Sequence, residues 1–330
     1  MDEYDLIINE YETALEAFDK CFLASEVEFA MEASNSKETT PSEDTGGEPL
    51  DKDITINPTA SMKTNGKDMN NDDINGKNGG VNPKSIKDRL DVLVKKIWGI
   101  VVKLSDSFLN LIKRALVTNK KFDGMYRSYK GKYKPATMIK VIIYPYERIG
   151  LLEKINNNFV NTIKIMCRDY RAALSSENDL EKSLIVLNKD DLQKEIMRIM
   201  DAPSNVESIA DNYVVLKNKI RGKKTEATVT VGDISKYEKA FYSAMDYTSE
   251  ANKRLKNCKD SIFTIKQANT VIGAMTNKNV SDLYSKASKF LSNINIMYSA
   301  YVAYCKTEFL LRSEYAFTGR AILKRMYRMP

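Results

Sequence analysis

The sequence predicts a mainly α-helical protein: a multi-helix bundle with a minor β element, preceded by an N-terminal helix and a disordered linker. Apolar residues recur three and four positions apart over long stretches, which is the period of one helix face. Strand-like alternation is confined to two short stretches, and a polar segment containing Gly and Pro separates the first helical pattern from the rest. We therefore divide the chain into residues 1–33, 34–83 and 84–330.

The first region, residues 1–33, has the pattern of an amphipathic helix over residues 4–31. Acidic residues occupy much of its surface, and its apolar face consists of Tyr4, Ile7, Tyr11, Ala14, Phe18, Phe22 and Phe29. Such a face must be buried against something, so we interpret this helix as a propeptide or a docking helix. Residues 34–83 contain no aromatic residue and several Asn-Gly turn formers. Because so little apolar surface cannot offset the entropy of folding, we predict a disordered linker.

The third region, residues 84–330, is predicted to be a basic helical domain. It begins with a long helix from the candidate N-cap Ser85 to about residue 115; its apolar stripe is typical of a core-facing helix, and an interfacial membrane helix is the alternative. A strand is expected at 138–144, ended by Pro145, and the alternating Thr/Val stretch after Lys224 fits a hairpin arm or an exposed loop. The remaining helices are predicted at 147–174, 178–187, 189–201, 204–220, 233–257, 260–275 and 281–327, the last with a break at Gly319.

The composition excludes several reaction classes. The chain has no histidine, which removes Ser-His-Asp and Cys-His nucleophiles and H-E-x-x-H metal sites. The cysteines lack C-x-x-C spacing, so we predict buried free thiols at Cys21, Cys167, Cys258 and Cys305. Without any cofactor or metal signature, we predict no cofactor, no small-molecule substrate and no enzymatic activity. An enzyme that uses Lys, Tyr and carboxylates stays open as a further class.

Charge is distributed unevenly along the chain. Residues 1–80 contain 19 acidic and 6 basic residues, whereas residues 81–330 contain 45 basic and 25 acidic residues. An acidic arm next to a basic body indicates self-shielding, affinity for nucleic acid, or both, and ordinary solubilising charge is the alternative. The acidic start and the lack of a long apolar run predict an intracellular protein without a secretory signal or a transmembrane segment.

The best nucleic-acid candidate is KKFDGMYRSYKGKYKP, residues 120–135. Basic side chains contact phosphates and aromatic rings stack on bases, so their alternation fits non-specific DNA binding. A solvated loop between helices, with tyrosines packed at its ends, is the alternative. A second basic run lies at residues 217–224. The residues predicted to contact nucleic acid are Lys120, Lys121, Arg127, Tyr129, Lys130, Lys132, Tyr133, Lys134, Arg221, Lys223 and Lys224.

Three short motifs within residues 1–33 place Ala two positions before Glu. They are Ala14-Leu15-Glu16, Ala24-Ser25-Glu26 and Ala30-Met31-Glu32, the last followed by Ala33. These motifs resemble the sites at which the internal protease of tailed-bacteriophage procapsids cuts resident proteins after Glu. The Asn-, Lys- and Ile-rich composition also resembles that of phages that infect low-GC bacteria.

The resemblance implies a phage virion protein, an internal head protein cut between Glu32 and Ala33. It implies assembly in the host cytoplasm with other virion or scaffold proteins. Loss of the acidic helix would make more Lys and Arg available to packaged DNA. The alternative is a helical structural or adaptor protein whose uncut N-terminal helix docks on a partner.

Overall fold

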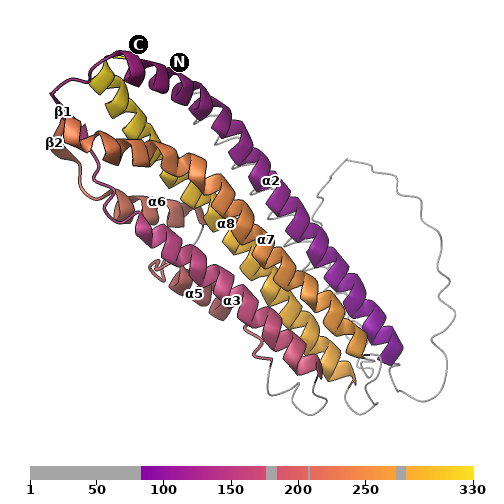
Figure 1. The fold of residues 1–330 in the computed structure, drawn as a ribbon. Helices are drawn as coiled ribbons and strands as arrows, with labels where there is room; N and C mark the ends of the chain where they lie inside the picture. The colour runs from indigo at the N-terminus through magenta and orange to yellow at the C-terminus, as the bar shows by residue number, and fades with distance from the viewer. Residues whose placement is uncertain (1–82, 176–183, 207–208, 273–279) are drawn as a thin grey trace, which may run out of the picture. The chain divides into compact units, whose positions relative to one another are not determined.

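A computed structural model describes residues 83–175, 184–206, 209–272 and 280–330 of the chain (Figure 1). These residues all belong to one compact unit. Its elements are α2 (Pro83–Lys132), β1 (Met138–Ile143), α3 (Gly150–Ser175), α5 (Lys189–Ile199), α6 (Ile209–Arg221), β2 (Thr225–Thr230), a 3-10 turn η1 (Val231–Asp233), α7 (Ile234–Ile272) and α8 (Val280–Tyr327). The prediction of a mainly α-helical protein with a minor β element is confirmed.

The predictions for residues 1–83 fall almost entirely outside the described residues. These are the N-terminal helix, the linker and the cleavage motif at Glu32 and Ala33. The one described residue of the predicted linker, Pro83, begins α2. Proline suits the first position of a helix because its missing N–H would have no partner there.

Four long helices, α2, α3, α7 and α8, form the body. α7 and α8 each pack against both α2 and α3, and Figure 1 shows the four helices running beside one another. α8 is central: every residue from 297 to 309 is buried, and α8 also contacts α5, α6 and β1. A helix segment that is covered on all sides needs a largely apolar surface, and most residues of this stretch are apolar, chiefly Tyr and Ala.

The apolar stripe of α2 faces the core, as predicted, because Leu90, Ile97, Val101 and Phe108 are buried. The predicted end near residue 115 is wrong. The same stripe continues to Tyr126, five helical turns after Phe108, where burial against the body holds the last part of α2 helical. No helix of the described ranges has an apolar stretch long enough to cross a membrane.

The strand predicted at 138–144 is confirmed as β1, and the Thr/Val stretch is its partner β2. The two strands are antiparallel, with Met138 opposite Thr230. Because side chains alternate along a strand, Val141 and Val229 face the interior while Ile142 is 66% exposed. The interior face of this ribbon covers a cluster that includes Phe122, Phe241, Leu323 and Tyr327. The ribbon therefore joins the C-terminal end of α2 to the start of α7 and the end of α8.

Helices α3, α5 and α8 agree closely with prediction, whereas α6 begins at Ile209 rather than at residue 204. The helix predicted at 178–187 is wrong for residues 184–187, which form neither a helix nor a strand, and its other residues lie outside the described ranges. The buried Asn293 side chain explains this conformation. Its Oδ1 accepts from the Leu187 N–H at 3.0 Å, and its Nδ2 donates to the Leu187 carbonyl at 3.1 Å.

The two predicted helix breaks are absent. α7 passes through residues 257–260, where buried Leu255, Cys258 and Ile262 keep one face on the core. α8 passes through Gly319, where an added Cβ would lie 2.6 Å from the Tyr237 carbonyl oxygen. Glycine here permits close approach of α8 to α7 rather than ending the helix.

The prediction of buried free thiols is confirmed for Cys167, Cys258 and Cys305. Burial disfavours the thiolate and raises the pKa of Cys258 to about 12. Low thiolate content makes such cysteines inert packing residues. Cys21 lies outside the described residues.

Candidate nucleic-acid interface

The basic and aromatic segment at residues 120–134 is not a loop, because α2 extends to Lys132. Its aromatic residues recur four, three and four positions apart, which places them along one helix face. Phe122 and Tyr126 are buried in the cluster under the ribbon, and only Tyr133 is largely exposed, at 56%. Tyr129 is half-buried, with its ring centroid 5.1 Å from that of Tyr133. Packing thus accounts for most of the aromatic pattern that suggested base stacking.

Two of the predicted DNA-contacting cations are tied to acidic residues of the body. Lys130 donates to Glu238 Oε1 at 2.5 Å, and Tyr126 donates to the same oxygen at 2.7 Å. Burial works to raise the pKa of Glu238, but these two hydrogen bonds outweigh it, and the pKa is lowered. Arg127 contacts Asp123 at 3.0 Å. The Lys130–Glu238 pair joins α2 to α7, and the Arg127–Asp123 pair lies within α2. In both pairs the carboxylate competes with a DNA phosphate for the cation.

The other cations of the segment have no such partner. Lys120, Lys121, Lys132 and Lys134 are exposed, and none forms an ion pair with a described residue. Lys120 and Lys132 lie about 18 Å apart along the helix axis, at 1.5 Å per residue. The predicted patch therefore divides into paired and free cations.

The fold brings the end of α8 next to the free cations at Lys132 and Lys134. The Ala136 N–H donates to the Met326 carbonyl at 2.8 Å, and Arg325 donates to the Lys140 carbonyl at 3.2 Å. None of the cations gathered here forms an ion pair with a described residue. We name this surface the basic end and define it as Lys132, Lys134, Lys140, Lys324, Arg325 and Arg328.

Arg328 owes its position to the way α8 ends. Its φ is 51°, in the left-handed region where glycine is usual. The N–H groups of Arg328 and Met329 donate to the carbonyls of Arg325 and Lys324, at 3.3 and 2.9 Å. This pair of bonds is the Schellman arrangement, which satisfies the last carbonyls of the helix. The turn thus holds an exposed cation just beyond the helix.

Sequence reasoning missed four of the six residues of the basic end. Basic residues suit the C-terminal end of a helix electrostatically, so the cations at the end of the last predicted helix need no functional interpretation, and Lys140 falls within a predicted strand. One signal was available: residues 317–330 contain four basic residues and no acidic residue. Their proximity to Lys134 depends on the contact between Ala136 and Met326, which spans most of the body in sequence.

The second predicted basic run does not join the basic end. Arg221 lies 3.6 Å from Glu314 and its guanidinium lies 3.7 Å from the Tyr144 ring centroid, so it is engaged within the body. Lys223 and Lys224 are exposed. They precede β2, whose first residue pairs with the last residue of β1, so the length of the ribbon, about 17 Å, separates them from Lys134.

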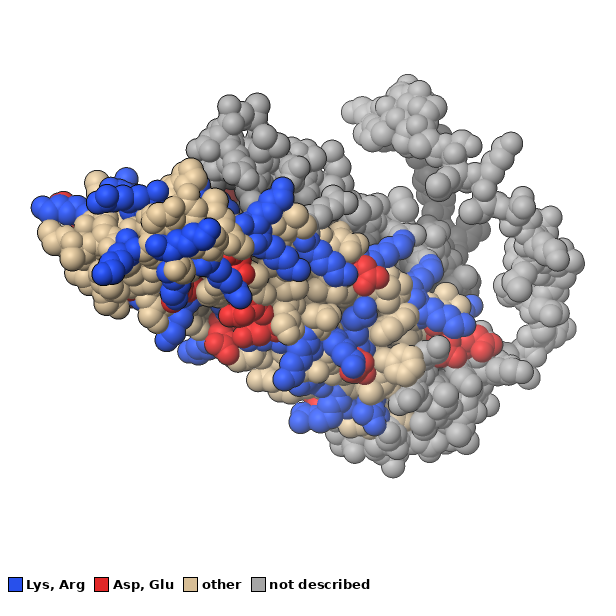
Figure 2. Space-filling model, turned by 45° about the horizontal axis from the view of Figure 1, so that its top comes forward, with Lys and Arg blue, Asp and Glu red and all other residues tan. Residues whose placement is uncertain are grey.

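Basic side chains are widespread on the surface. Figure 2 shows them in blue along the whole visible face of the described body, with acidic side chains in smaller groups. This arrangement creates a positive field that attracts polyanions from a distance. The basic end gathers six cations from α2, β1, α8 and the adjoining turns, and none of them forms an ion pair with a described residue.

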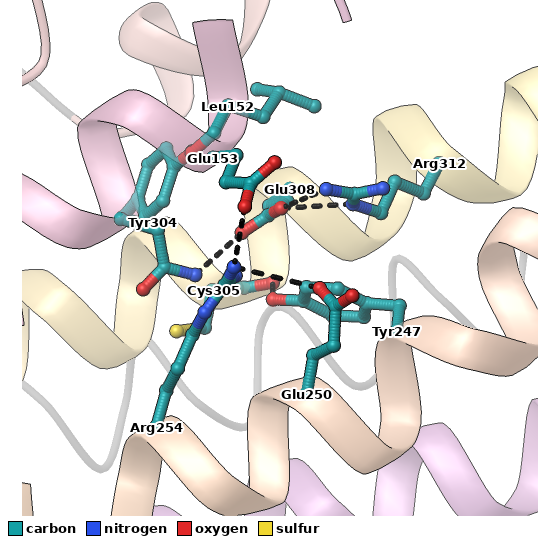
Figure 3. Close-up of polar contacts among 10 residues, drawn as sticks. Leu152, Glu153, Tyr247, Glu250, Arg254, Tyr304, Cys305, Glu308 and Arg312 are labelled. Carbon is teal, nitrogen blue, oxygen red and sulfur yellow. Dashed lines mark hydrogen bonds and ion pairs between the residues drawn. The ribbon is translucent and has the colours of Figure 1, made fainter. Parts of the chain in front are cut away.

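A separate polar cluster lies inside the bundle, around the fully buried Glu308 (Figure 3). Arg312 Nε and Nη2 each lie 2.8 Å from Glu308 Oε1, and Asn156 Nδ2 donates to Oε2 at 2.8 Å. Burial raises the pKa of Glu308, against the opposing effect of these partners. Both carboxylate oxygens are therefore already hydrogen-bonded within the protein. Because Asn156 belongs to α3 and Glu308 to α8, the cluster also ties these two helices together.

The polar contacts around Glu308 extend to α7. Arg254 lies 3.6 Å from Glu153 and 3.5 Å from Glu250, and Tyr247 donates to the Cys305 carbonyl at 3.0 Å. An open depression of about 430 Å³ lies beside this cluster and is lined by Lys239, Tyr242, Ser243, Asp246, Tyr247, Glu250 and Arg312. Glu308 does not line it. Among the described residues, no cluster of acidic residues and cysteines is suited to holding a metal ion.

No protein-family model matches this chain, and neither a curated protein nor a solved structure matches it.

Proposed function

We propose that this protein is a non-enzymatic structural protein of a phage virion, an internal head protein whose body contacts packaged DNA through the basic end. The observation that carries the proposal is the group of six cations that lack an acidic partner among the described residues. Phosphates are the partners that such a group suits, because each contact releases a counterion from DNA.

The composition of the basic end supports binding without sequence preference. Its side chains are Lys and Arg, which contact backbone phosphates and position a protein on DNA without reading bases. Tyr133, between Lys132 and Lys134, offers one exposed ring for stacking on an unpaired base. Lys120, Lys121, Lys223 and Lys224 extend the positive surface beyond the basic end.

Processing after Glu32 completes the proposal, and it depends on the resemblance of residues 30–33 to procapsid cleavage sites. Residues 1–32 contain ten acidic residues and one basic residue, so their removal changes the net charge from +7 to +16. This change would strengthen attraction to DNA inside a capsid. Intact mass and N-terminal sequencing of the protein from virions test this step. A chain intact from Met1 would instead favour an adaptor that docks through its N-terminal helix.

DNA binding by the full chain is tested by fluorescence anisotropy with a labelled duplex at several salt concentrations. The variant Lys134→Gln/Lys140→Gln/Arg328→Gln removes three cations of the basic end. We expect the slope of log K against log salt to fall in magnitude by about 3, at about 0.9 per lost phosphate contact. Lys130 is left unchanged because its loss would also break the pair with Glu238.

The matched control carries the same charge change at exposed residues of α2, α5 and α7 outside the basic end, Lys103→Gln/Lys189→Gln/Lys253→Gln. We expect it to leave the slope within about 1 of the unchanged protein, because these residues contribute only to the long-range field. An equal loss in both variants would mean that binding is spread over the surface and would reject the basic end. Failure of both the full chain and the chain that begins at Ala33 to bind DNA at low salt would reject the proposed DNA contact altogether.

A further inference from the structure

Part of α2 presents apolar side chains outside the face that packs on the body. Trp98, Val102, Leu109 and Leu116 are four, seven and seven residues apart, so they form a line beside the buried stripe. All four are half-buried. Phe263 of α7 adjoins this line; its ring centroid is 5.7 Å from that of Trp98, and it is 45% exposed. We name these five residues the α2 strip.

The edge of the α2 strip is basic. Lys95 and Lys113, on the outer side of the same helix, are exposed and form no ion pair with a described residue. The acidic residue between them, Asp106, lies 3.8 Å from Lys259. An apolar line with unpaired lysines beside it fits an amphipathic helix that has an apolar face and acidic flanks.

Residues 4–31 of the same chain have this chemistry. Their sequence predicts one apolar face, with Phe18 and Phe22 near its middle, and the first 33 residues contain ten acidic residues and one basic residue. We propose that residues 4–31 dock as a helix on the α2 strip of their own chain. The partner of the N-terminal helix is then α2, and no second protein is needed to cover its apolar face.

The connection between the two segments has a suitable length. Residues 34–82 precede Pro83, the first residue of α2. If this segment is flexible, as its sequence predicts, it spans on the order of 40 Å, from about 5–6 Å times the square root of the residue number. Trp98 and Leu116 lie roughly 22 and 50 Å from Pro83 along the helix axis. The tether therefore keeps residues 4–31 at a high effective concentration near the strip.

This inference goes beyond the proposed function and does not depend on it. The α2 strip runs from Trp98 to Leu116, in the middle third of α2, and Leu116 lies about 24 Å from Lys132 along the axis. Docking therefore leaves the basic end uncovered, and the two sites are tested by different measurements. If cleavage after Glu32 occurs, the docked helix is the part that must dissociate.

The chain contains the two probes that the test requires. Trp98 is its one tryptophan. The described cysteines are buried, so a thiol-reactive energy acceptor can be attached to Cys21 in the full chain, with Cys21→Ser as the labelling control. We expect efficient transfer from Trp98 to the acceptor that does not change on dilution, because donor and acceptor belong to one molecule.

Two variants of the N-terminal segment carry the same charge change. Phe18→Asp/Phe22→Asp alters the predicted apolar face and is expected to abolish most of the transfer. Asn9→Asp/Thr13→Asp alters the opposite face and is expected to leave the transfer within about 20% of the unchanged protein, because surface substitutions away from contacts have small effects. Circular dichroism of each variant checks that the body is folded.

Three results would overturn the inference. Weak transfer in the unchanged chain would mean that residues 4–31 lie away from α2. Equal loss of transfer in both variants would mean that charge, and not the apolar face, governs the approach. Transfer that disappears on dilution would mean that the helix docks on a second copy. DNA binding is measured separately, so failure here leaves the proposed function standing.

Discussion

Replacing Gly319 with alanine is expected to destabilise the contact between α7 and α8. An added Cβ would lie 2.6 Å from the Tyr237 carbonyl oxygen, 2.9 Å from the Phe241 nitrogen and 3.1 Å from the Ala240 Cβ. Two of these atoms belong to the backbone of α7, so no side-chain rotation relieves the clash. The helices would have to separate by several tenths of an ångström at a position where Ala240 and Phe241 are fully buried.

The magnitude follows from comparison with Gly99→Ala. Gly99 lies inside α2, and an added Cβ there meets nothing within 4 Å. In both helices alanine gains about 1 kcal/mol of helix propensity over glycine. This gain cancels when the two variants are compared, which leaves the overpacking cost at Gly319, typically about 1–3 kcal/mol.

Urea denaturation followed by far-UV circular dichroism measures this difference. We expect Gly99→Ala to raise the free energy of unfolding by about 0.5–1 kcal/mol. We expect Gly319→Ala to fall about 1–3 kcal/mol below Gly99→Ala. If both variants were equally stable within about 0.5 kcal/mol, the close approach of α7 and α8 at Gly319 would be refuted.

Two further predictions concern the interior. Burial raises the pKa of Glu308 above its ordinary value of 4.5, so the folded state binds more protons than the unfolded state just above that pH, and stability declines as the pH rises through the folded pKa. Glu308→Gln should remove this part of the decline in urea midpoints measured between pH 4.5 and 7; an unchanged decline would mean that other groups cause it. Tyr298 lies 2.5 Å from Ser105 Oγ, and because Ser105 donates to the Val101 carbonyl, Tyr298 is the donor. Tyr298→Phe should cost about 1–2 kcal/mol in urea denaturation, while Tyr133→Phe, at an exposed position, should cost less than about 0.5 kcal/mol; equal costs would argue against a stabilising bond between α2 and α8.

The sequence alone does not predict which cations of α2 form ion pairs and which are free. Lys130 and Lys132 have the same chemistry and lie two residues apart, yet Lys130 pairs with Glu238, more than one hundred residues away, and Lys132 forms no ion pair with a described residue. A pattern within 16 residues cannot contain this information. The basic composition of the patch was predictable, but the residues free to bind a phosphate were not.

The same distinction applies to the ends of the helices. Local spacing placed α3, α5 and α8 correctly because an apolar face repeats within each segment. Local spacing predicted that α2 ends too early and that the last helix breaks at Gly319. Both predictions were wrong because contacts with other elements determine the helix at these positions. Tyr126 continues α2 by packing on Tyr327, with ring centroids 5.5 Å apart, and Gly319 is placed by the approach of α7.

The sequence alone determined the helical class, the acidic and basic halves, the lack of imidazole chemistry and the strand that ends before Pro145. These properties depend on composition or on neighbours within one helical turn. Tertiary structure decided that β2 pairs with β1, that residues 297–309 of α8 are covered on all sides, and that the end of α8 adds its cations to those at the end of α2 and beyond it. Each of these depends on contacts between elements far apart in the chain, which local periodicity does not encode.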